Sequence, residues 1–490
     1  MPTLSKSRFL AGLQCPLRLW NQCYNPELAS EVPPARQAIF DTGHEVGRLA
    51  TRLYPKGLLI EEDHLHHETA VYHTRVVMQE SEIGAIYEAA FLDDNVRVRV
   101  DVLQKGGNER WNLIEVKSST SLKDVHLPDV AIQHHVLKRA GLDMDRVILM
   151  HLNNRYVYDG KNIELEHLFC TCDMTRKVLV YENQIPSLLA DFSEFLERSD
   201  EPDIRPGRHC KIPYECEFWE HCTKDMPDHW VMELAGISQR RLNELAALGI
   251  QDIREIPDTF PLTAIQDRIR DSVKGQKEYI SPELGNELEN VEYPIHFIDF
   301  ETVNPAIPRY ALTRPYQTIP FQWSDHILKD DGTIEHLEYL SEEDADPREA
   351  FAETLLNALG KRGQILTYSD YENKIIKGLM GSLPQFSDGF ISILPRFKDL
   401  CKIIQRHYYH PDFHGSFSLK SVLPALFPDM TYTTLAIQEG TQASLEYLRM
   451  IDPATPSEEK QRIKQDLLTY CGYDTLAMVK VRDELMKRLF

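Results

Sequence analysis

The sequence lacks the apolar segments that membrane insertion or secretion requires. Among its 490 residues there is no apolar run of membrane-spanning length. The opening stretch, Met1–Trp20, contains no apolar core followed by a small-residue cleavage site, so no signal peptide is predicted. We therefore expect a cytoplasmic protein that has no membrane partner.

The sequence also lacks an excess of positive charge. It contains 54 Lys and Arg residues against 76 Asp and Glu residues, for a formal net charge of −22. A general nucleic-acid coat protein would be basic, so this balance argues against that class. It does not exclude a nuclease, because active-site carboxylates add negative charge and a local basic groove can coexist with an acidic exterior.

A disulfide framework, internal repeats and low-complexity tracts are missing too. Nine cysteines, an odd number in a chain without a secretion signal, do not predict disulfide pairing. The composition is 42% hydrophobic and 27% charged, which is typical of a globular protein, and the length predicts two or three domains. We expect an α/β chain divided into residues 1–225, a helical connector at 226–289, and residues 290–490.

A first cluster of carboxylates is predicted on a β-hairpin. The alternation in Val96–Leu103 places four valines on one face, Val102 the last of them, and puts Asp101 on the other face with two arginines. After a turn, Glu115 and Lys117 share a face of a second strand, and the hairpin brings Asp101 near them. Two carboxylates can hold Mg²⁺, and a lysine can orient water or stabilise phosphate charge. On spacing alone, a surface hairpin with one Glu–Lys pair is an equal alternative.

The order Asp101, then Glu115-Val116-Lys117, resembles the D…ExK core of the PD-(D/E)xK nuclease superfamily, and of RecB-type nuclease domains in particular. The resemblance implies a restriction-endonuclease-like fold in which Asp101, Glu115 and Lys117 are catalytic and the two acids bind Mg²⁺ or Mn²⁺. It also implies that Gln133, on a helix opening at Val130, approaches the active site.

Two positions depart from this family. A tyrosine often follows the glutamine by four residues, where this chain has Leu137. A metal-binding histidine is expected on an upstream helix at Gly47, and His44, one turn away, is the substitute that we assign as a metal ligand. Glu88 is either an extra acid or an ordinary surface residue.

Cysteines flank this nuclease-like segment. One early cysteine and a late C-x5-C-x5-C group resemble the layout of iron–sulfur RecB-type nucleases, in which four thiolates hold a [4Fe–4S] cluster. The predicted ligands are Cys15, Cys210, Cys216 and Cys222. Closing so long a loop would stabilise the domain strongly. Zinc is the alternative metal, because four thiolates also suit it; unligated buried cysteines are the third interpretation, and Cys23 competes with Cys15.

The connector contains short apolar helices around Leu248-Gly249-Ile250, a pattern like a helix-hairpin-helix module. Such modules offer backbone N–H groups to phosphates. A plain helical connector explains the pattern equally well.

A second cluster of acids opens the C-terminal segment. Asp299 and Glu301 share one face of a predicted strand, and two acids so placed repel each other unless a cation lies between them. Tyr470 and Asp474, four residues apart, lie on one face of a long terminal helix.

These residues resemble the D-x-E and Y-x-x-x-D motifs of the DEDD exonucleases. The resemblance implies an RNase H-like fold and two catalytic metal ions, with Asp299, Glu301 and Asp474 among the ligands and Tyr470 positioning water. For the remaining acid we predict Glu372, after Tyr371, with Asp370 as runner-up and Asp399 as a weaker candidate; a helix cap is the alternative role for the others.

The run from Arg406 to Lys420 is rich in basic and aromatic residues. It predicts either contact with single-stranded nucleic acid through stacking and charge, with Lys420 as the residue to test, or a packed loop.

As a whole the chain resembles a bacterial family that fuses a RecB-like nuclease to a DEDD exonuclease. We expect hydrolysis of DNA, at single strands or ends, and from the 3′ end for the C-terminal site. The alternatives are a nucleic-acid-binding protein with one or both sites inactive, and an RNA-processing exonuclease, since no residue recognisably reads the 2′-OH.

Overall fold

The computed structural model describes residues 2–107, 110–198 and 200–489. They form a mixed α/β protein that divides into two compact units. Unit 1 comprises residues 1–225 and 306–316, and unit 2 comprises residues 226–305 and 317–490. The helical connector therefore belongs to unit 2. None of the described helices is both long and apolar enough to cross a membrane.

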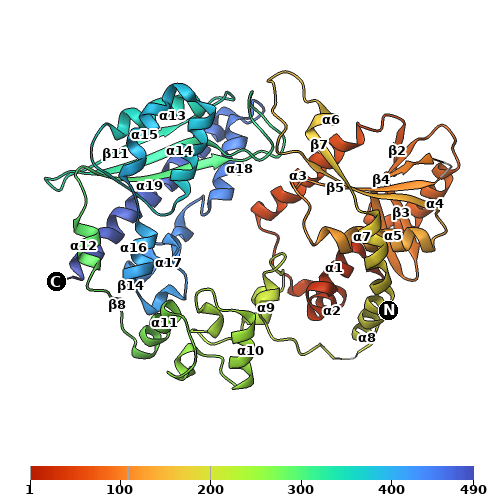
Figure 1. Cartoon of the computed structure of the whole chain (residues 1–490), viewed down its shortest axis with the longest axis horizontal. Helices are drawn as coiled ribbons and strands as arrows, with labels where there is room; N and C mark the ends of the chain where they lie inside the picture. Colours follow the sequence, from red (N-terminus) through yellow and green to blue (C-terminus); the bar gives the residue numbers. More distant parts are fainter. Residues whose placement is uncertain (1, 108–109, 199, 490) are drawn as a thin grey trace. The chain divides into compact units, whose positions relative to one another are not determined.

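Unit 1 is built around a mixed sheet with the strand order β2-β3-β4-β5-β6-β7, with β1 beside β4 (Figure 1). Its strands are β1 (Leu4–Ser5), β2 (Gly57–Leu59), β3 (Ala85–Asp93), β4 (Val96–Lys105), β5 (Trp111–Lys117), β6 (Met144–Leu152) and β7 (Phe169–Asp173). Its helices are α1 (Lys6–Gln14), α2 (Pro16–Tyr24), α3 (Pro34–Thr51), α4 (His67–Met78), α5 (His126–Arg139), α6 (Leu165–Leu168), α7 (Thr175–Tyr181), α8 (Ile185–Glu197) and α9 (Trp219–Thr223).

The centre of this sheet joins an antiparallel meander to a parallel crossover. Strands β3, β4 and β5 are antiparallel neighbours, and β5 lies parallel to β6. A parallel pair needs a crossover connection, and α5 supplies it. The helix begins at His126, one turn earlier than the sequence pattern predicted, because Asp129 and its neighbours continue the buried face of Val130 and Gln133.

Two of the core clusters in the described part of unit 1 involve its sheet. The larger joins β3, β4 and β5 to α1, α4, α5, α7 and α8, and the smaller joins the sheet to α3 and to residues 306–316. Val96, Val98 and Val100 pack in the larger cluster, but Val102 packs in the smaller one. The prediction that all four valines share a face is therefore wrong. Opposite this point Glu88 has a left-handed φ of 54°, which breaks the regular alternation of the paired strands.

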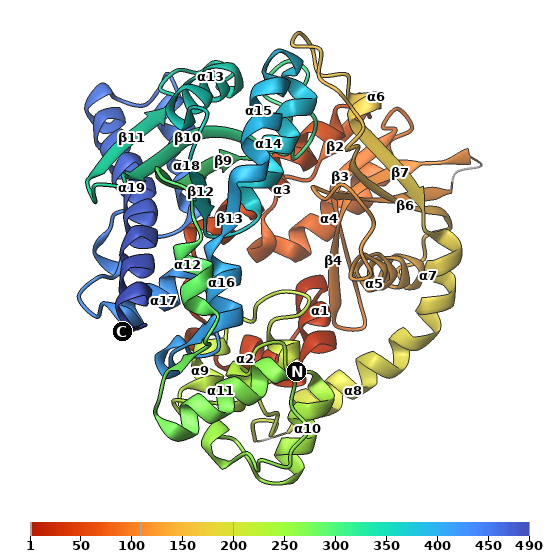
Figure 2. The ribbon, with the colours of Figure 1, turned by 60° about the vertical axis from the view of Figure 1, so that its left-hand side comes forward.

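Unit 2 has a five-stranded sheet in the order β11-β10-β9-β12-β13 (Figure 2). The strands of this sheet are β9 (Ile295–Val303), β10 (Ile319–Leu328), β11 (Ile334–Leu340), β12 (Gln364–Thr367) and β13 (Phe397–Asp399). A separate two-stranded sheet consists of β8 (Tyr279–Ile280) and β14 (Tyr408–Tyr409). The helices of unit 2 are α10 (Gln239–Ala247), α11 (Ala264–Gly275), α12 (Leu284–Glu289), α13 (Arg348–Leu359), α14 (Tyr371–Ser382), α15 (Ser387–Ile393), α16 (Leu400–His407), α17 (Leu419–Leu426), α18 (Gly440–Ile451) and α19 (Ser457–Lys487).

Helices cover both faces of this sheet. Ile298 and Phe300 of β9 point into a core formed with α13, α14 and α15. On the other face, Phe321 of β10 stacks on Tyr447 of α18, and α19 contacts β9 and β10. Because side chains alternate along a strand, Asp299 and Glu301 point to the opposite face, toward α19.

The sequence pattern predicted a purely helical connector, but the connector also contains a strand and 3-10 turns. The short strand β8 pairs with β14, and the segment after Gly249 forms a single 3-10 turn, Ile253–Glu255, in place of a second full helix. The apolar residues Ile253 and Ile256 are buried there, so the turn packs as part of unit 2.

Candidate functional site: two carboxylate centres

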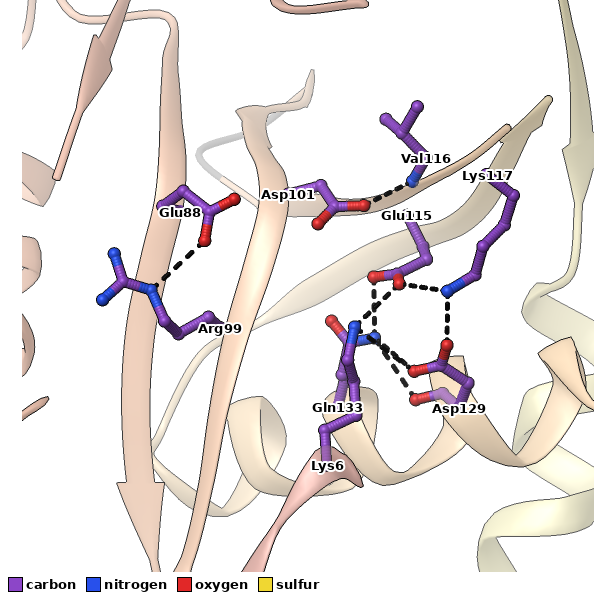
Figure 3. Close-up of polar contacts among 9 residues, drawn as sticks. All are labelled: Lys6, Glu88, Arg99, Asp101, Glu115, Val116, Lys117, Asp129 and Gln133. Carbon is purple, nitrogen blue, oxygen red and sulfur yellow. Dashed lines mark hydrogen bonds and ion pairs between the residues drawn. The ribbon is translucent and has the colours of Figure 1, made fainter. Parts of the chain in front are cut away.

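The first centre lies where β4, β5 and α5 meet (Figure 3). Pairing of Val102 with Ile114 brings the next residues, Asp101 and Glu115, to the same position of the hairpin. Asp101 accepts a hydrogen bond from the backbone N–H of Val116 at 2.7 Å. The Glu115 side chain is almost completely buried.

Glu115 is held by three donors. Its Oε1 accepts from Lys117 Nζ at 2.6 Å and from Lys6 Nζ at 2.8 Å, and its Oε2 accepts from Gln133 Nε2 at 2.8 Å (Figure 3). Asp129, one helical turn before Gln133, accepts from Lys117 at 2.5 Å and lies 3.4 Å from Lys6. Two ammonium groups and two carboxylates therefore form one closed network.

The two acids of this hairpin differ in their protonation. Burial alone would raise the pKa of Glu115, but the charges of Lys117 and Lys6 hold it well below its usual range. Burial and the neighbouring Glu115 raise the pKa of Asp101 to about 7. Asp101 is thus the acid whose ionisation costs free energy and which a bound cation would favour.

A metal fits this centre less readily than its motif implies. The Glu115 oxygens are already bonded to two ammoniums and an amide, so a cation between Asp101 and Glu115 would displace an ammonium contact. His44, proposed as a third ligand, lies on the exposed side of α3, whose Val46 and Ala50 pack into the core. No described contact joins His44 to either acid, so its role as a metal ligand stays a prediction.

Two members of the network were missed in the sequence. Asp129 precedes Gln133 by four residues, and this helical spacing could have identified it. Lys6 carries no local signal, because it comes from α1, far upstream, and reaches Glu115 only in the folded unit. Glu88 pairs with Arg99 at 3.2 Å and is half exposed, in keeping with a surface role.

The four predicted cysteine ligands gather at one place in unit 1. Cys15 lies at the junction of α1 and α2. Burial and the neighbouring Cys15 raise the pKa of Cys210. Burial and the neighbouring Cys210 and Cys15 raise the pKa of Cys222 to about 11. Cys210, Cys216 and Phe218 form a small buried cluster with Cys222 at its edge. Burial raises the pKa of Cys216 to about 12. No three of these four described sulfur atoms lie within 4.8 Å of one another.

The second centre lies between β9 and α19 in unit 2. Asp299 and Glu301 share the face of β9 opposite Ile298 and Phe300, as predicted, and Asp474 and Tyr470 lie on the facing side of α19. Burial and then Asp474, Glu301 and Glu372 raise the pKa of Asp299 well above its usual range. The structure therefore brings the four predicted acids into one electrostatic cluster.

Glu372 is buried at the start of α14, and its Oε2 has no hydrogen-bond partner. Burial and the neighbouring acids Asp399 and Asp370 raise the pKa of Glu372 to about 8. Its rivals also have local partners. Asp370 accepts from the Asn373 amide at 3.1 Å, and Asp399 caps α16 by accepting from the Lys402 N–H at 2.9 Å.

One family model matches part of this unit. Residues 296–418 match a domain of unknown function (DUF2779). The matched segment contains Asp299, Glu301 and Glu372 and ends before Tyr470 and Asp474. No curated protein matches the chain.

The sequence did not indicate two further residues of the second centre. Tyr432 donates a hydrogen bond to Asp474. The Cys471 thiol lies 3.6 Å from Asp299 Oδ2, and ligand atoms of Asp299, Glu301 and Cys471 lie within 4.8 Å of one another. Cys471 follows Tyr470 directly, but nothing in its type or spacing marked it as a neighbour of the acids.

Lys420 brings a positive charge to this centre. Its ammonium lies 5.4 Å from the ring of Tyr432 and 5.8 Å from the ring of Tyr470, and its charge lowers the pKa of Glu301 and Asp474. The aromatic residues before it, Tyr408, Tyr409 and Phe413, are buried. The structure therefore favours the packed loop for these aromatic residues of the run from Arg406 to Lys420, whereas Arg406 is exposed and Lys420 lies at the acidic centre.

A pocket of about 290 Å³ opens beside the N-terminal end of α14. Its lining includes Asp370 and Asp399, and also Lys398, Lys402 and Arg406. Lys402 and Arg406 are exposed and four residues apart on α16, so they share a helix face. The same pocket therefore holds basic side chains together with Asp370 and Asp399, the two acids that raise the pKa of Glu372.

Proposed function

We propose that the protein is a metal-dependent nuclease whose principal site is the acidic cluster of unit 2. The observation that carries the proposal is the cluster of four acids, in which Glu301 and Glu372 are buried and Asp299 and Asp474 are half-buried, and in which the pKa of every acid is raised. Clustered carboxylates that repel one another, with Glu372 Oε2 unpartnered, are the donors that hard divalent cations prefer. Lys420 alone does not balance four acids.

The residues have separate roles in this proposal. Mg²⁺ or Mn²⁺ bound there would supply a Lewis acid and an activated water. Asp299, Glu301, Glu372 and Asp474 would hold the ions, and Tyr470, beside Asp474, would orient the attacking water by its hydroxyl. Lys420 would lie near a substrate phosphate, and Lys402 and Arg406 would contact the backbone of a single strand further along.

The strand arrangement supports the same proposal. An antiparallel meander β9-β10-β11 extended by parallel strands, with helices on both faces, is compatible with an RNase H-like fold. The meander β3-β4-β5 followed by a helix and the parallel β6 is compatible with a PD-(D/E)xK fold for unit 1. DNA is the proposed substrate, with attack from its 3′ end in unit 2.

The first centre has a second candidate role. Because Glu115 is bonded to both Lys6 and Lys117, unit 1 would bind nucleic acid, or cleave it weakly, while unit 2 hydrolyses it. Cys15, Cys210, Cys216 and Cys222 would hold a [4Fe–4S] cluster in this proposal, with zinc as the alternative metal for four thiolates.

Labelled oligonucleotides would test the proposal. With Mg²⁺ or Mn²⁺ the full chain should shorten single-stranded DNA stepwise from the 3′ end. Asp299→Asn should lower the rate by at least about 100-fold, because it removes an acid from the cation site. Lys117→Met, the matched change in unit 1, should reduce it by less than about tenfold. The proposal fails if the wild type does not degrade DNA or if Asp299→Asn is fully active.

RNA of the same sequence separates the remaining alternative. An RNA-processing enzyme would degrade RNA faster than DNA under the same conditions. Tight binding of either strand without metal-dependent turnover would instead identify a binding protein with inactive sites.

A further inference from the structure

Unit 2 contains a second group of metal-binding side chains, away from the acidic cluster. His229 precedes the 3-10 turn Val231–Glu233, and His414 directly follows the 3-10 turn Pro411–Phe413. One ligand atom each from His229, Glu233 and His414 lie within 4.8 Å of one another. Two segments that are far apart in the sequence of unit 2 thus bring two imidazoles and one carboxylate together.

One polar atom of this group is buried without a hydrogen-bond partner. His229 is nine-tenths buried, and its Nδ1 has no hydrogen-bond partner. Burying such an atom without a partner is unfavourable. The rings of His229 and His414 are stacked with their centroids 5.4 Å apart, and His414 Nδ1 lies 3.4 Å from Glu233 Oε2.

The backbone around His414 is held in an uncommon conformation. His414 has a φ of 47° and Gly415 a φ of 71°. A Cβ at Gly415 would lie 1.6 Å from the Glu233 carbonyl oxygen, so only glycine allows the two segments to approach this closely. The Gly415 N–H also donates to the hydroxyl of the buried Tyr409 at 3.1 Å. A left-handed histidine costs about 1 kcal/mol, and it is retained where it presents the ring to Glu233.

We propose that His229, Glu233 and His414 bind one divalent transition-metal ion, zinc in the first instance, with a fourth position open to water. Two imidazoles and one carboxylate form a ligand set that zinc uses, and they suit zinc better than Mg²⁺, which prefers oxygen ligands. His414 is half exposed, so the open position faces solvent. The bound ion fastens the connector segment that follows Asp225 to the loop before α17 and stabilises unit 2.

Zinc titration of the full chain tests this site. Protein freed of metal by a chelator and then desalted is titrated with zinc alone against a competing chromogenic chelator. The wild type should bind one equivalent more than His414→Asn and than Glu233→Gln. Asn tolerates the left-handed backbone, so His414→Asn should fold with an unchanged circular dichroism spectrum. The matched control, His410→Asn in the same loop, should bind as much zinc as the wild type.

Two further readouts make the outcome specific. Zinc should raise the melting temperature of unit 2 by more in the wild type and in His410→Asn than in the two ligand variants. Cobalt(II) should give visible absorption bands that lose one equivalent of intensity in His414→Asn. The site is disproved if His414→Asn binds as many equivalents of zinc as the wild type, or if Mg²⁺ produces the same difference in melting temperature between the wild type and His414→Asn as zinc does. Neither result depends on nuclease activity.

Discussion

Asp101 and Glu115 occupy adjacent strands of one hairpin, yet their surroundings drive their ionisation in opposite directions. Glu115 receives two ammoniums, whereas Asp101 receives one backbone N–H and faces Glu115. An acid held in this way stores free energy that a cation can release. Ionised Asp101 should therefore lower the free energy of unfolding of the metal-free protein by a measurable amount.

Replacing Asp101 by asparagine should stabilise the metal-free protein at high pH. The pKa of Asp101 is about 7 in the folded state and near its usual value in the unfolded state. Its contribution to stability is complete below pH 4 and is lost as the pH rises through 7. In a chelator, Asp101→Asn should gain on the order of 1–4 kcal/mol at pH 8 and little at pH 4, because the amide oxygen still accepts from Val116.

Urea denaturation of the full chain at both pH values measures this difference. The exposed Asp94, changed to asparagine, is the control and should show no pH-dependent gain. Equal effects of the two variants at pH 8 would contradict the prediction.

At the scale of elements, α19 is the part of unit 2 that brings residues of the terminal segment to β9. It is fixed to β10 by buried polar contacts as well as by packing. The Thr475 hydroxyl bonds Ser324 Oγ and His326 Nδ1, each at 2.8 Å, and the Gln322 amide donates to the Leu467 carbonyl at 2.9 Å. These bonds set the rotation of α19 that points Asp474 toward Asp299.

Thr475→Val should destabilise unit 2 without changing the shape of the side chain. It leaves two buried polar groups with one partner fewer, at a cost of about 1–3 kcal/mol. For a unit of this size the melting temperature should fall by roughly 2–8 °C in calorimetry. Thr469→Val, the same change at an exposed position of the same helix, should lie within about 1 °C of the wild type. A similar loss in both variants would show that helix propensity, rather than the buried hydroxyl, is responsible.

The elements were easier to predict from sequence than the contacts between them. Alternation predicted β9 with Asp299 and Glu301 on one face, and the four-residue spacing predicted that Tyr470 and Asp474 share a face of α19. Both signals are local. The Glu88 irregularity, which moves Val102 to another core cluster, and the contribution of Lys6 depend on tertiary structure, so no window of sequence contains them.

At the scale of the whole molecule, the two units should melt separately, and the cysteine set should matter to only one of them. Cys15 and the late cysteines join the two ends of the first 225 residues. A bound cluster would therefore close nearly all of the unit 1 chain into one loop.

Cys216→Ser should lower the melting temperature of unit 1 and leave that of unit 2 unchanged. Loss of one thiolate would remove the proposed cluster and, with it, the free energy of metal binding. Calorimetry of the purified protein, together with absorbance near 400 nm and metal analysis, measures both effects. Cys23→Ser, the competing early cysteine, is the control and should keep the absorbance. If Cys23→Ser loses it and Cys15→Ser does not, the ligand assignment is wrong.

The membership of residues 306–316 in unit 1 has a consequence for biosynthesis. Ala306, Ile307 and Tyr316 pack in the smaller core cluster of that unit, and Leu312 and Thr313 exchange backbone hydrogen bonds with Tyr158. A nascent chain that has emerged only as far as Asp225 lacks these contacts. The N-terminal half must therefore wait, with part of its core uncovered, until the ribosome has translated the connector and β9. Folding of this protein during synthesis cannot proceed as two successive, self-sufficient halves.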